Sequence, residues 1–151
     1  MRALALVLAL GVVGSSARAG EKEEKLAKDA IGAFLKAVKE KDADKVMKTV
    51  AAPFAHKDGG AVEVIDDEKK LKEWVAERLK VVDADNVPAE VENFMSFDKV
   101  KENIKVEDDR KKVEKVVGKE GYVGTFSVNG TTIVVVARVK DGKAAVVGVG
   151  R

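Results

Sequence analysis

The sequence predicts an α+β fold, in which helices pack against a curved antiparallel sheet. Three apolar segments, residues 121–128, 131–139 and 143–149, are rich in valine, which favours β-strands. Asn129-Gly130 and Asp141-Gly142 separate these segments, and both dipeptides tolerate the positive φ angles of a two-residue hairpin. Most of the chain before residue 121 has helical periodicity instead. Helices beside an antiparallel sheet indicate the α+β class.

Residues 1–19 have the plan of a secretory signal peptide. Arg2 precedes an apolar run over residues 3–13, and Ala17-Arg18-Ala19 forms an Ala-x-Ala cleavage site. The apolar run is too short to cross a bilayer core of about 30 Å, which argues against a transmembrane anchor. We therefore expect cleavage after Ala19 and export to the periplasm or the exterior. Residues 20–151 then form one domain with one core.

Composition argues against several classes of function. Removing Arg2 and Arg18 lowers the number of basic residues from 28 to 26, which equals the 26 acidic ones. A formally neutral mature chain gives no electrostatic reason to expect nucleic acid or a membrane as a partner. The chain has no cysteine, so disulfides and thiol chemistry are unavailable to it. No phosphate-binding, nucleophile or metal-ligand motif occurs, so we expect no cofactor and no metal.

The N-terminal part of the domain predicts two helices and a hairpin. Residues 21–39 form an amphipathic pattern whose apolar stripe is Leu26, Ala30, Ile31, Phe34, Leu35 and Val38. Asp42 is the expected N-cap of a shorter helix that runs through Val50. Pro53 ends this region, and residues 54–57 and 61–65 are expected to pair around a glycine turn.

The middle of the chain predicts a third helix, a strand and a helical insert. Three acids, residues 66–68, can cap the third helix and complement its dipole; Leu71, Trp74, Val75, Arg78 and Leu79 follow at helical spacing. Pro88 begins an extended stretch over about residues 89–97. Two short helices are expected within residues 98–117, the second ending before Gly118. The acids at residues 107–109 are explained as helix-start residues.

If both closing turns have two residues, the register of the three last strands follows. One face then carries Tyr122, Gly124, Phe126, Ile133, Val135, Ala137, Val146 and Gly148. The other carries Val123, Thr125, Val134, Val136, Arg138, Val147 and Val149. Because glycines let a sheet bend or a neighbour approach, we assign the first face to the concave side. Helices would cover it, with a cavity between.

The second face would be convex, and left bare it would expose a large apolar patch, which monomers avoid. Two solutions remain open. The chain could form a homodimer through this face, or the insert at residues 98–117 could fold across it. Arg138 interrupts the apolar pattern and is a candidate for a dimer contact or an ion pair.

The order of elements resembles the NTF2-like superfamily, including its SnoaL-like and cystatin-like domains. The resemblance lies in the long first helix, the second helix beginning at residues 41–44, Ala52-Pro53-Phe54 with its hairpin, and the closing residues 139–148. It implies a sheet wrapped around helices as a cone, often with an apolar pocket and often dimeric. The superfamily includes isomerases, dehydratases, cyclases, ligand-binding proteins and adaptors, so the fold does not select a function. The helical insert departs from its usual plain hairpin.

Five residues are candidate ligand-binding positions: Phe54, His56, Trp74, Tyr122 and Phe126. His56, the only histidine, could act with Asp58 as a general base, or could be a surface histidine beside a turn aspartate. Tyr122 could donate a hydrogen bond to a ligand at the open end of the concave face, or could lie at the core edge with a hydrated hydroxyl. Trp74 is expected in the core near any pocket. None is assigned a catalytic role.

Three hypotheses for function follow. The first is an exported domain that binds a small apolar ligand or a protein partner. The second is a small isomerase or dehydratase of the ketosteroid isomerase kind, with His56 or Asp58 as base and Tyr122 as donor. The third is a structural dimer module whose core is filled. The first two require a cavity between the third helix and the concave face.

Overall fold

The computed structural model describes residues 15–151, with side chains from residue 20 onward. Most of the predicted signal peptide, residues 1–14, lies outside the described residues. Residues 15–19 are helical and continue into the first helix of the domain. None of the helices in the described part combines the length and the apolar character that crossing a membrane requires.

The first three predicted helices are confirmed. They are α1 (Ser15–Lys39), α2 (Ala43–Thr49) and α3 (Glu68–Val81). Aspartates begin two of them. The Asp42 carboxylate accepts a hydrogen bond from the Lys45 backbone N–H at 3.0 Å. The Asp67 carboxylate accepts one from the Lys70 N–H at 2.9 Å. Each satisfies a backbone donor that has no partner within its helix.

The sheet has six strands in the order β2-β1-β6-β5-β4-β3. The strands are β1 (Val50–Lys57), β2 (Glu63–Ile65), β3 (Asn93–Ser96), β4 (Gly121–Val128), β5 (Thr131–Lys140) and β6 (Lys143–Gly150). β1 pairs with β6 in parallel, so the sheet is mixed and not wholly antiparallel as expected. Several helices and strands separate β1 from β6 along the chain, and a connection of that length permits a parallel arrangement.

Pro53 lies inside strand β1, whereas the sequence predicted that the strand would begin after it. β1 begins at Val50, directly after α2, so Pro53 belongs to β1. The pairing of β1 with β6 is irregular between Val50 and Ala55. A residue without a backbone N–H is tolerated at such an interruption of the ladder, which accounts for the error in the predicted start of the strand.

The predicted register is correct for β4 and β5 and correct for only part of β6. Phe126 pairs with Ile133 and Gly124 with Val135, as expected. Ala137 pairs with Val146, but Val135 pairs with Val149 because the register shifts between Val136 and Ala137. One extra residue in β6 exchanges the two faces beyond that point. Gly148 therefore lies on the convex face beside Val136, and Val149 lies on the concave face.

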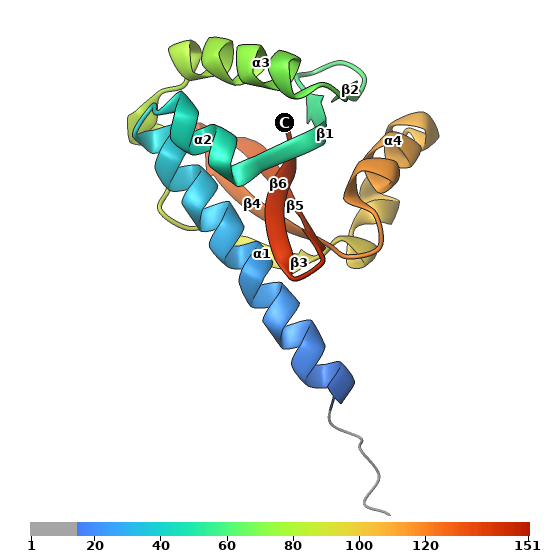
Figure 1. The fold of residues 1–151 in the computed structure, drawn as a ribbon. Coiled ribbons are helices and arrows are strands. Elements are labelled where there is room, and N and C mark those ends of the chain that lie inside the picture. The colour runs from blue at the N-terminus through green and yellow to red at the C-terminus, as the bar shows by residue number, and fades with distance from the viewer. Residues whose placement is uncertain (1–14) are drawn as a thin grey trace, which may run out of the picture.

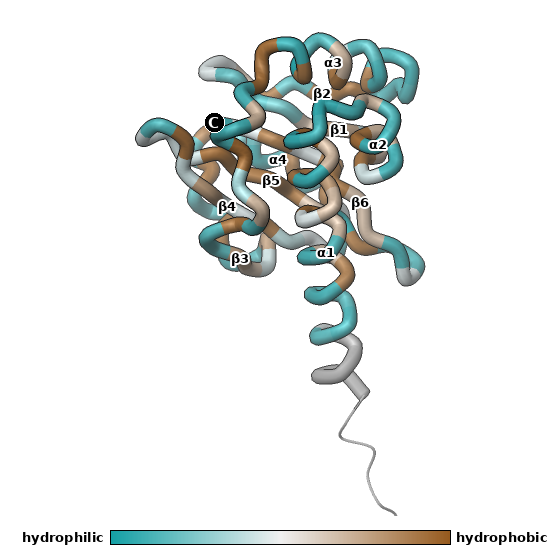
Figure 2. Tube along the Cα trace, turned by 90° about the vertical axis from the view of Figure 1, so that its left-hand side faces the viewer, coloured by the Kyte–Doolittle hydropathy of each residue, from teal (hydrophilic) through white to brown (hydrophobic). Residues whose placement is uncertain are grey.

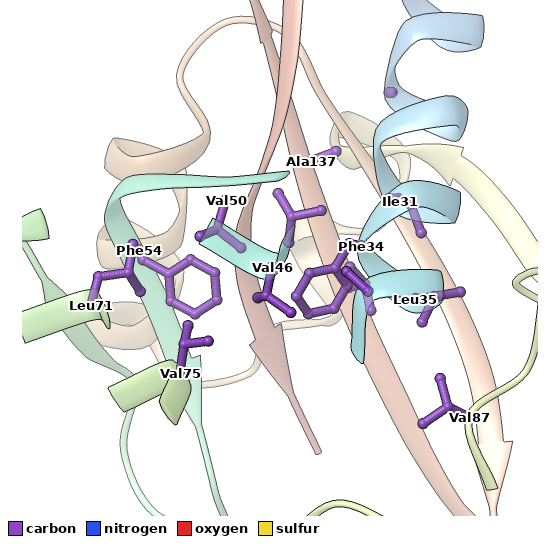
Figure 3. Close-up of a cluster of buried hydrophobic side chains, with 14 of the residues drawn as sticks. Ile31, Phe34, Leu35, Val46, Val50, Phe54, Leu71, Val75, Val87 and Ala137 are labelled. Atoms are coloured by element: carbon purple, nitrogen blue, oxygen red, sulfur yellow. The ribbon is translucent and has the colours of Figure 1, made fainter. Parts of the chain in front are cut away.

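The main core lies on the concave face, under α1, α2 and α3. Figure 1 shows these helices on one side of the curved sheet and α4 on the other. Figure 3 shows side chains from α1, α2, β1 and α3 pointing toward one another; the cluster includes Ile31, Phe34, Leu35, Val46, Phe54, Leu71 and Val75. Burial of one such large side chain stabilises the fold by roughly 1.5–3 kcal/mol.

The convex face is covered by residues of the insert, which was one of the two solutions left open. The insert forms α4 (Glu107–Val117), preceded by two 3₁₀ turns where a first short helix was expected. Phe97, Val113 and Val117 join Val123, Val136 and Val147 in a second buried cluster. Arg138 donates a hydrogen bond to the Val116 carbonyl at 3.0 Å. A homodimer through this side stays a prediction, and it would have to contact α4.

Together these features form an α+β cone, in which a curved sheet wraps around helices (Figure 1), as the order of elements predicted. The strands of β4, β5 and β6 form a hydrophobic centre in Figure 2, whereas the outer turns of the helices are hydrophilic. The sheet is open, with β2 and β3 at its two edges.

Candidate ligand-binding site

A cavity of about 510 Å³ lies between α1, α3 and the concave face of the sheet. This volume falls within the range of roughly 300–1,000 Å³ that small-molecule sites occupy. Its lining is predominantly apolar, with residues from three sides that include Phe34, Trp74, Leu79, Phe126, Ile133 and Val149. We call it the concave cavity. The predicted space between the third helix and this face is present.

Trp74 forms an aromatic wall of the concave cavity. Its ring centroid lies 5.2 Å from that of Phe54 and 5.0 Å from that of His56. The Arg78 guanidinium lies 5.5 Å from the Trp74 ring centroid, within the range of a cation–π contact. Phe54 is fully buried, so Trp74 packs against a core residue on one side.

An ion-pair cluster forms the polar end of the cavity. The Asp58 carboxylate accepts hydrogen bonds from Arg78 Nη1 at 2.8 Å and from Arg151 Nε at 2.5 Å. These two guanidinium groups lower the pKa of Asp58 below its ordinary value. Asp58 therefore stays charged and is already paired, which makes it a poor proton acceptor.

His56 is half-buried at the cavity wall. Its side chain is 13% exposed, and its Nε2 lies 3.5 Å from Glu63 Oε2 on the neighbouring strand. Burial lowers the pKa of His56, and the nearby Glu63 carboxylate opposes that shift only in part. The side chain is thus neither an exposed surface histidine nor hydrogen-bonded to Asp58, whose partners are the two arginines.

Tyr122 lies apart from the other candidates. It is outside the lining of the concave cavity and stacks on Phe94, with ring centroids 5.6 Å apart and planes 4° apart. Burial and the nearby Glu23 carboxylate raise its pKa. Although Tyr122 and Phe126 share a face of β4, four residues of strand separate them by about 13 Å. His56 and Tyr122 are therefore not brought together as an acid–base pair.

The structure gathers His56, Trp74 and Phe126 around one cavity, with Phe54 behind them. Sequence reasoning did not assign Arg78 or Arg151 to the site. Arg78 follows Trp74 by four residues on α3, which places the two side chains on one helix face, and that spacing could have been used. No pattern in the sequence indicated that Arg151 meets Asp58. Within residues 15–151 no three His, Asp or Glu side chains cluster so as to hold a metal ion.

Similarity to known proteins is confined to the fold. No protein-family model matches the sequence, and no curated protein matches it. The structure is similar to an NTF2-like protein with a cystatin-like fold from Novosphingobium aromaticivorans, with 11% identity over 93% of this chain and 90% of the other, at a TM-score of 0.47.

Two further solved structures are similar at lower TM-scores. An NTF2-like protein of unknown function from Pseudomonas putida KT2440 is 9% identical over 91% of this chain and 87% of its own, with a TM-score of 0.42. A candidate polyketide cyclase from Xanthomonas campestris pv. campestris is 14% identical over 85% and 90%, with a TM-score of 0.39. Similarity at this level leaves the function to be inferred from this chain's own cavity and side chains.

Proposed function

We propose that the chain is an exported NTF2-like domain that binds a small apolar ligand in the concave cavity. One observation carries the proposal: a volume of about 510 Å³ is lined mainly by apolar side chains, and its ionic groups are the paired Lys57, Asp58, Arg78 and Arg151 and the exposed Asp83. Cavities of this kind are the usual sites for small molecules. Export is supported by the signal-peptide pattern of residues 1–19.

The side chains also define what the ligand contacts. Trp74 and Phe126 offer flat apolar surfaces, which favour a ligand with an aromatic or fused-ring body. The pairs of Asp58 with Arg78 and Arg151 satisfy the charged groups without a ligand. A neutral ligand therefore leaves no buried charge unpaired when it enters, and no ion pair has to break.

Trp74 is the only tryptophan of the chain and lines this cavity, so its fluorescence is a single signal whose change on binding can be compared between variants. We expect N-phenyl-1-naphthylamine, a neutral apolar fluorophore, to quench Trp74 by energy transfer at a ratio of one per chain. Ile133→Phe should weaken this binding at least fivefold, because Ile133 is part of the lining. The matched control is Thr132→Phe, which adds the same ring at the exposed neighbouring position on the other face.

The two variants separate cavity binding from adsorption to the surface. If Thr132→Phe and Ile133→Phe bind the fluorophore equally well, the probe is outside the cavity and the proposal is wrong. Native mass spectrometry of protein from its own source adds a second measurement, because a retained small molecule would give a defined extra mass that Ile133→Phe should remove.

A further inference from the structure

A second cavity lies on the opposite side of the sheet. It has a volume of about 630 Å³ and lies between the convex face and residues 97–117. Phe97, Val113 and Val116 line it from the insert, and Val123, Val136 and Val147 line it from the strands. We call it the convex cavity. It meets the concave cavity only at the ends of β1 and β6, so the sheet separates the two.

The bulge in β6 and the position of α4 create this space. The register shift turns Gly148 toward the convex cavity, where it contributes no side chain. A Cβ at Gly148 would come within 2.9 Å of the Ala55 carbonyl oxygen. No larger residue can therefore fill the space from this position unless the β1 backbone moves.

A buried ion pair holds α4 over the cavity. The Asp109 side chain is 2% exposed, and its Oδ2 lies 2.9 Å from Lys57 Nζ on β1. Its other oxygen accepts a hydrogen bond from the Val62 N–H at 2.9 Å. These contacts fix the start of α4 against the β1–β2 hairpin. The cavity is thus built from fixed elements on both sides, as a binding site requires.

Charge distinguishes the two cavities. The charged side chains in the lining of the convex cavity are Lys57, Lys105 and Arg151, and among the described residues no aspartate or glutamate belongs to it. Asp109 balances Lys57, and Asp58 balances Arg151. Lys105 is exposed on the loop that precedes α4. The lining of the concave cavity, by contrast, contains both signs of charge: it has the carboxylates of Asp58 and Asp83 beside Lys57, Arg78 and Arg151.

We propose that the convex cavity is a second ligand site that takes an amphipathic monoanion, such as a medium-chain carboxylate. The hydrocarbon chain lies between α4 and the strands, among valine side chains that exclude water. The carboxylate lies at the loop, where Lys105 supplies the positive charge. The site does not depend on the proposed function of the concave cavity, because the two share no wall other than the strand ends.

Adjacent residues of β5 allow each cavity to be blocked separately. Ile133 lines only the concave cavity, and Val134 lines only the convex one. Dodecanoate is the probe, and its binding is counted by native mass spectrometry and isothermal titration calorimetry. We expect Ile133→Phe to retain one dodecanoate per chain and Val134→Phe to lose that molecule. If Val134→Phe is unfolded by circular dichroism, Thr125→Met serves as the second variant, since Thr125 is a half-buried lining residue.

The head-group assignment has its own test. Lys105→Glu should weaken dodecanoate binding to Ile133→Phe about fivefold, which corresponds to a solvent-exposed charge pair. The binding of 1-dodecanol should change little. Lys99→Glu, at an exposed position outside the cavity lining, makes the same change in net charge and should leave both affinities unaltered.

Two outcomes would overturn the second site. In one, Ile133→Phe abolishes all dodecanoate binding, so that the molecule occupies the concave cavity alone and only the proposed function survives. In the other, dodecanoate binds Val134→Phe and Thr125→Met as well as the parent protein. If Lys105→Glu and Lys99→Glu weaken dodecanoate binding equally, the charge assignment is wrong as well. Failure of the fluorophore test leaves these outcomes unaffected.

Discussion

His56 shows how burial changes a titratable group at the edge of a cavity. The imidazole packs against the Trp74 ring at a tilt and is largely withdrawn from water, which disfavours its charged form. Its pKa therefore lies below the ordinary value of about 6.5 that it recovers on unfolding. Between those two pKa values the unfolded chain binds a proton that the folded chain does not. Stability contributed by neutral His56 is complete above about pH 6.5 and is lost as the pH falls.

This shift predicts a specific pH dependence. Between pH 7.5 and pH 5.5 the urea midpoint of the wild type should fall, and His56→Gln should show a smaller fall. Urea titrations followed by circular dichroism measure both. Glu63→Gln is the control, because it removes the neighbouring carboxylate but leaves the buried histidine in place. Equal falls in the wild type and in His56→Gln would contradict the assignment.

At the residue scale, the sequence predicted which side chains are buried better than it predicted which ones meet. Phe54, Trp74 and Phe126 lie at the concave face as their periodicity indicated. The contact between Asp58 and Arg151 joins residues 93 positions apart, and no local pattern encodes it. Tyr122 was placed on the correct face, but distance along the strand decided that it lies away from His56. Face is a local property, whereas proximity depends on how the strands curve and pack.

At the scale of elements, α4 depends on a contact that the sequence did not indicate. Residues 107–109 were explained as helix-start acids, but the N-cap residue Val106 makes no side-chain cap. Asp109 points away from solvent to Lys57 and the Val62 N–H, and these two partners hold its pKa below the ordinary value. The explanation by capping was wrong for Asp109, because a helix start and a tertiary contact look alike in sequence.

Asp109→Asn should therefore destabilise the protein, because it removes the charge that Lys57 and the Val62 N–H solvate. We expect the midpoint of thermal unfolding to fall by several degrees. Asp108→Asn is the matched control, since Asp108 is 75% exposed and pairs with Lys112 at 3.0 Å. Such exposed pairs contribute little. Differential scanning calorimetry at pH 7 compares the two variants, and equal midpoints would show that Asp109 does not anchor α4.

The strand pairings show where reasoning about elements succeeds and where it fails. Both Asn-Gly and Asp-Gly turns form with positive φ at Asn129 and Asp141, so each hairpin follows from local chemistry. The register shift in β6 and the parallel pairing of β6 with β1 do not follow from local chemistry. Each is determined by strands that are distant in sequence, and β1 comes within reach of β6 only when the whole sheet assembles.

At the scale of the whole molecule, the proposed export makes a direct prediction about the mature protein. Intact-mass measurement of protein secreted by its native host should give a chain that begins at Gly20, since cleavage is expected after Ala19. Ala19→Pro and Ala17→Glu should block processing, because the cleavage site requires small residues, whereas Lys22→Glu should process normally. Retention of residues 1–19 in the exported protein would contradict the signal-peptide interpretation.

The predicted homodimer also concerns the whole molecule. A homodimer through the convex side was predicted because the apolar face of β4, β5 and β6 would otherwise be exposed. In the structure α4 lies over this face. The outer face of α4 carries exposed ion pairs, such as Lys111 with Glu107 at 2.7 Å. A dimer formed there would have to bury charged side chains, which is costly.

The central position of β6 has a consequence for how the chain becomes folded. β6 is the third of six strands in the sheet, between β1 and β5, so the β1–β2 hairpin reaches the rest of the sheet only through residues 143–150. Until those residues have left the ribosome, β1 has no strand partner except the three-residue strand β2. The six-stranded sheet can therefore be completed only after residues 143–150 have been synthesised. This order of assembly is compatible with the proposed export, because translocation through a narrow channel needs an unfolded chain.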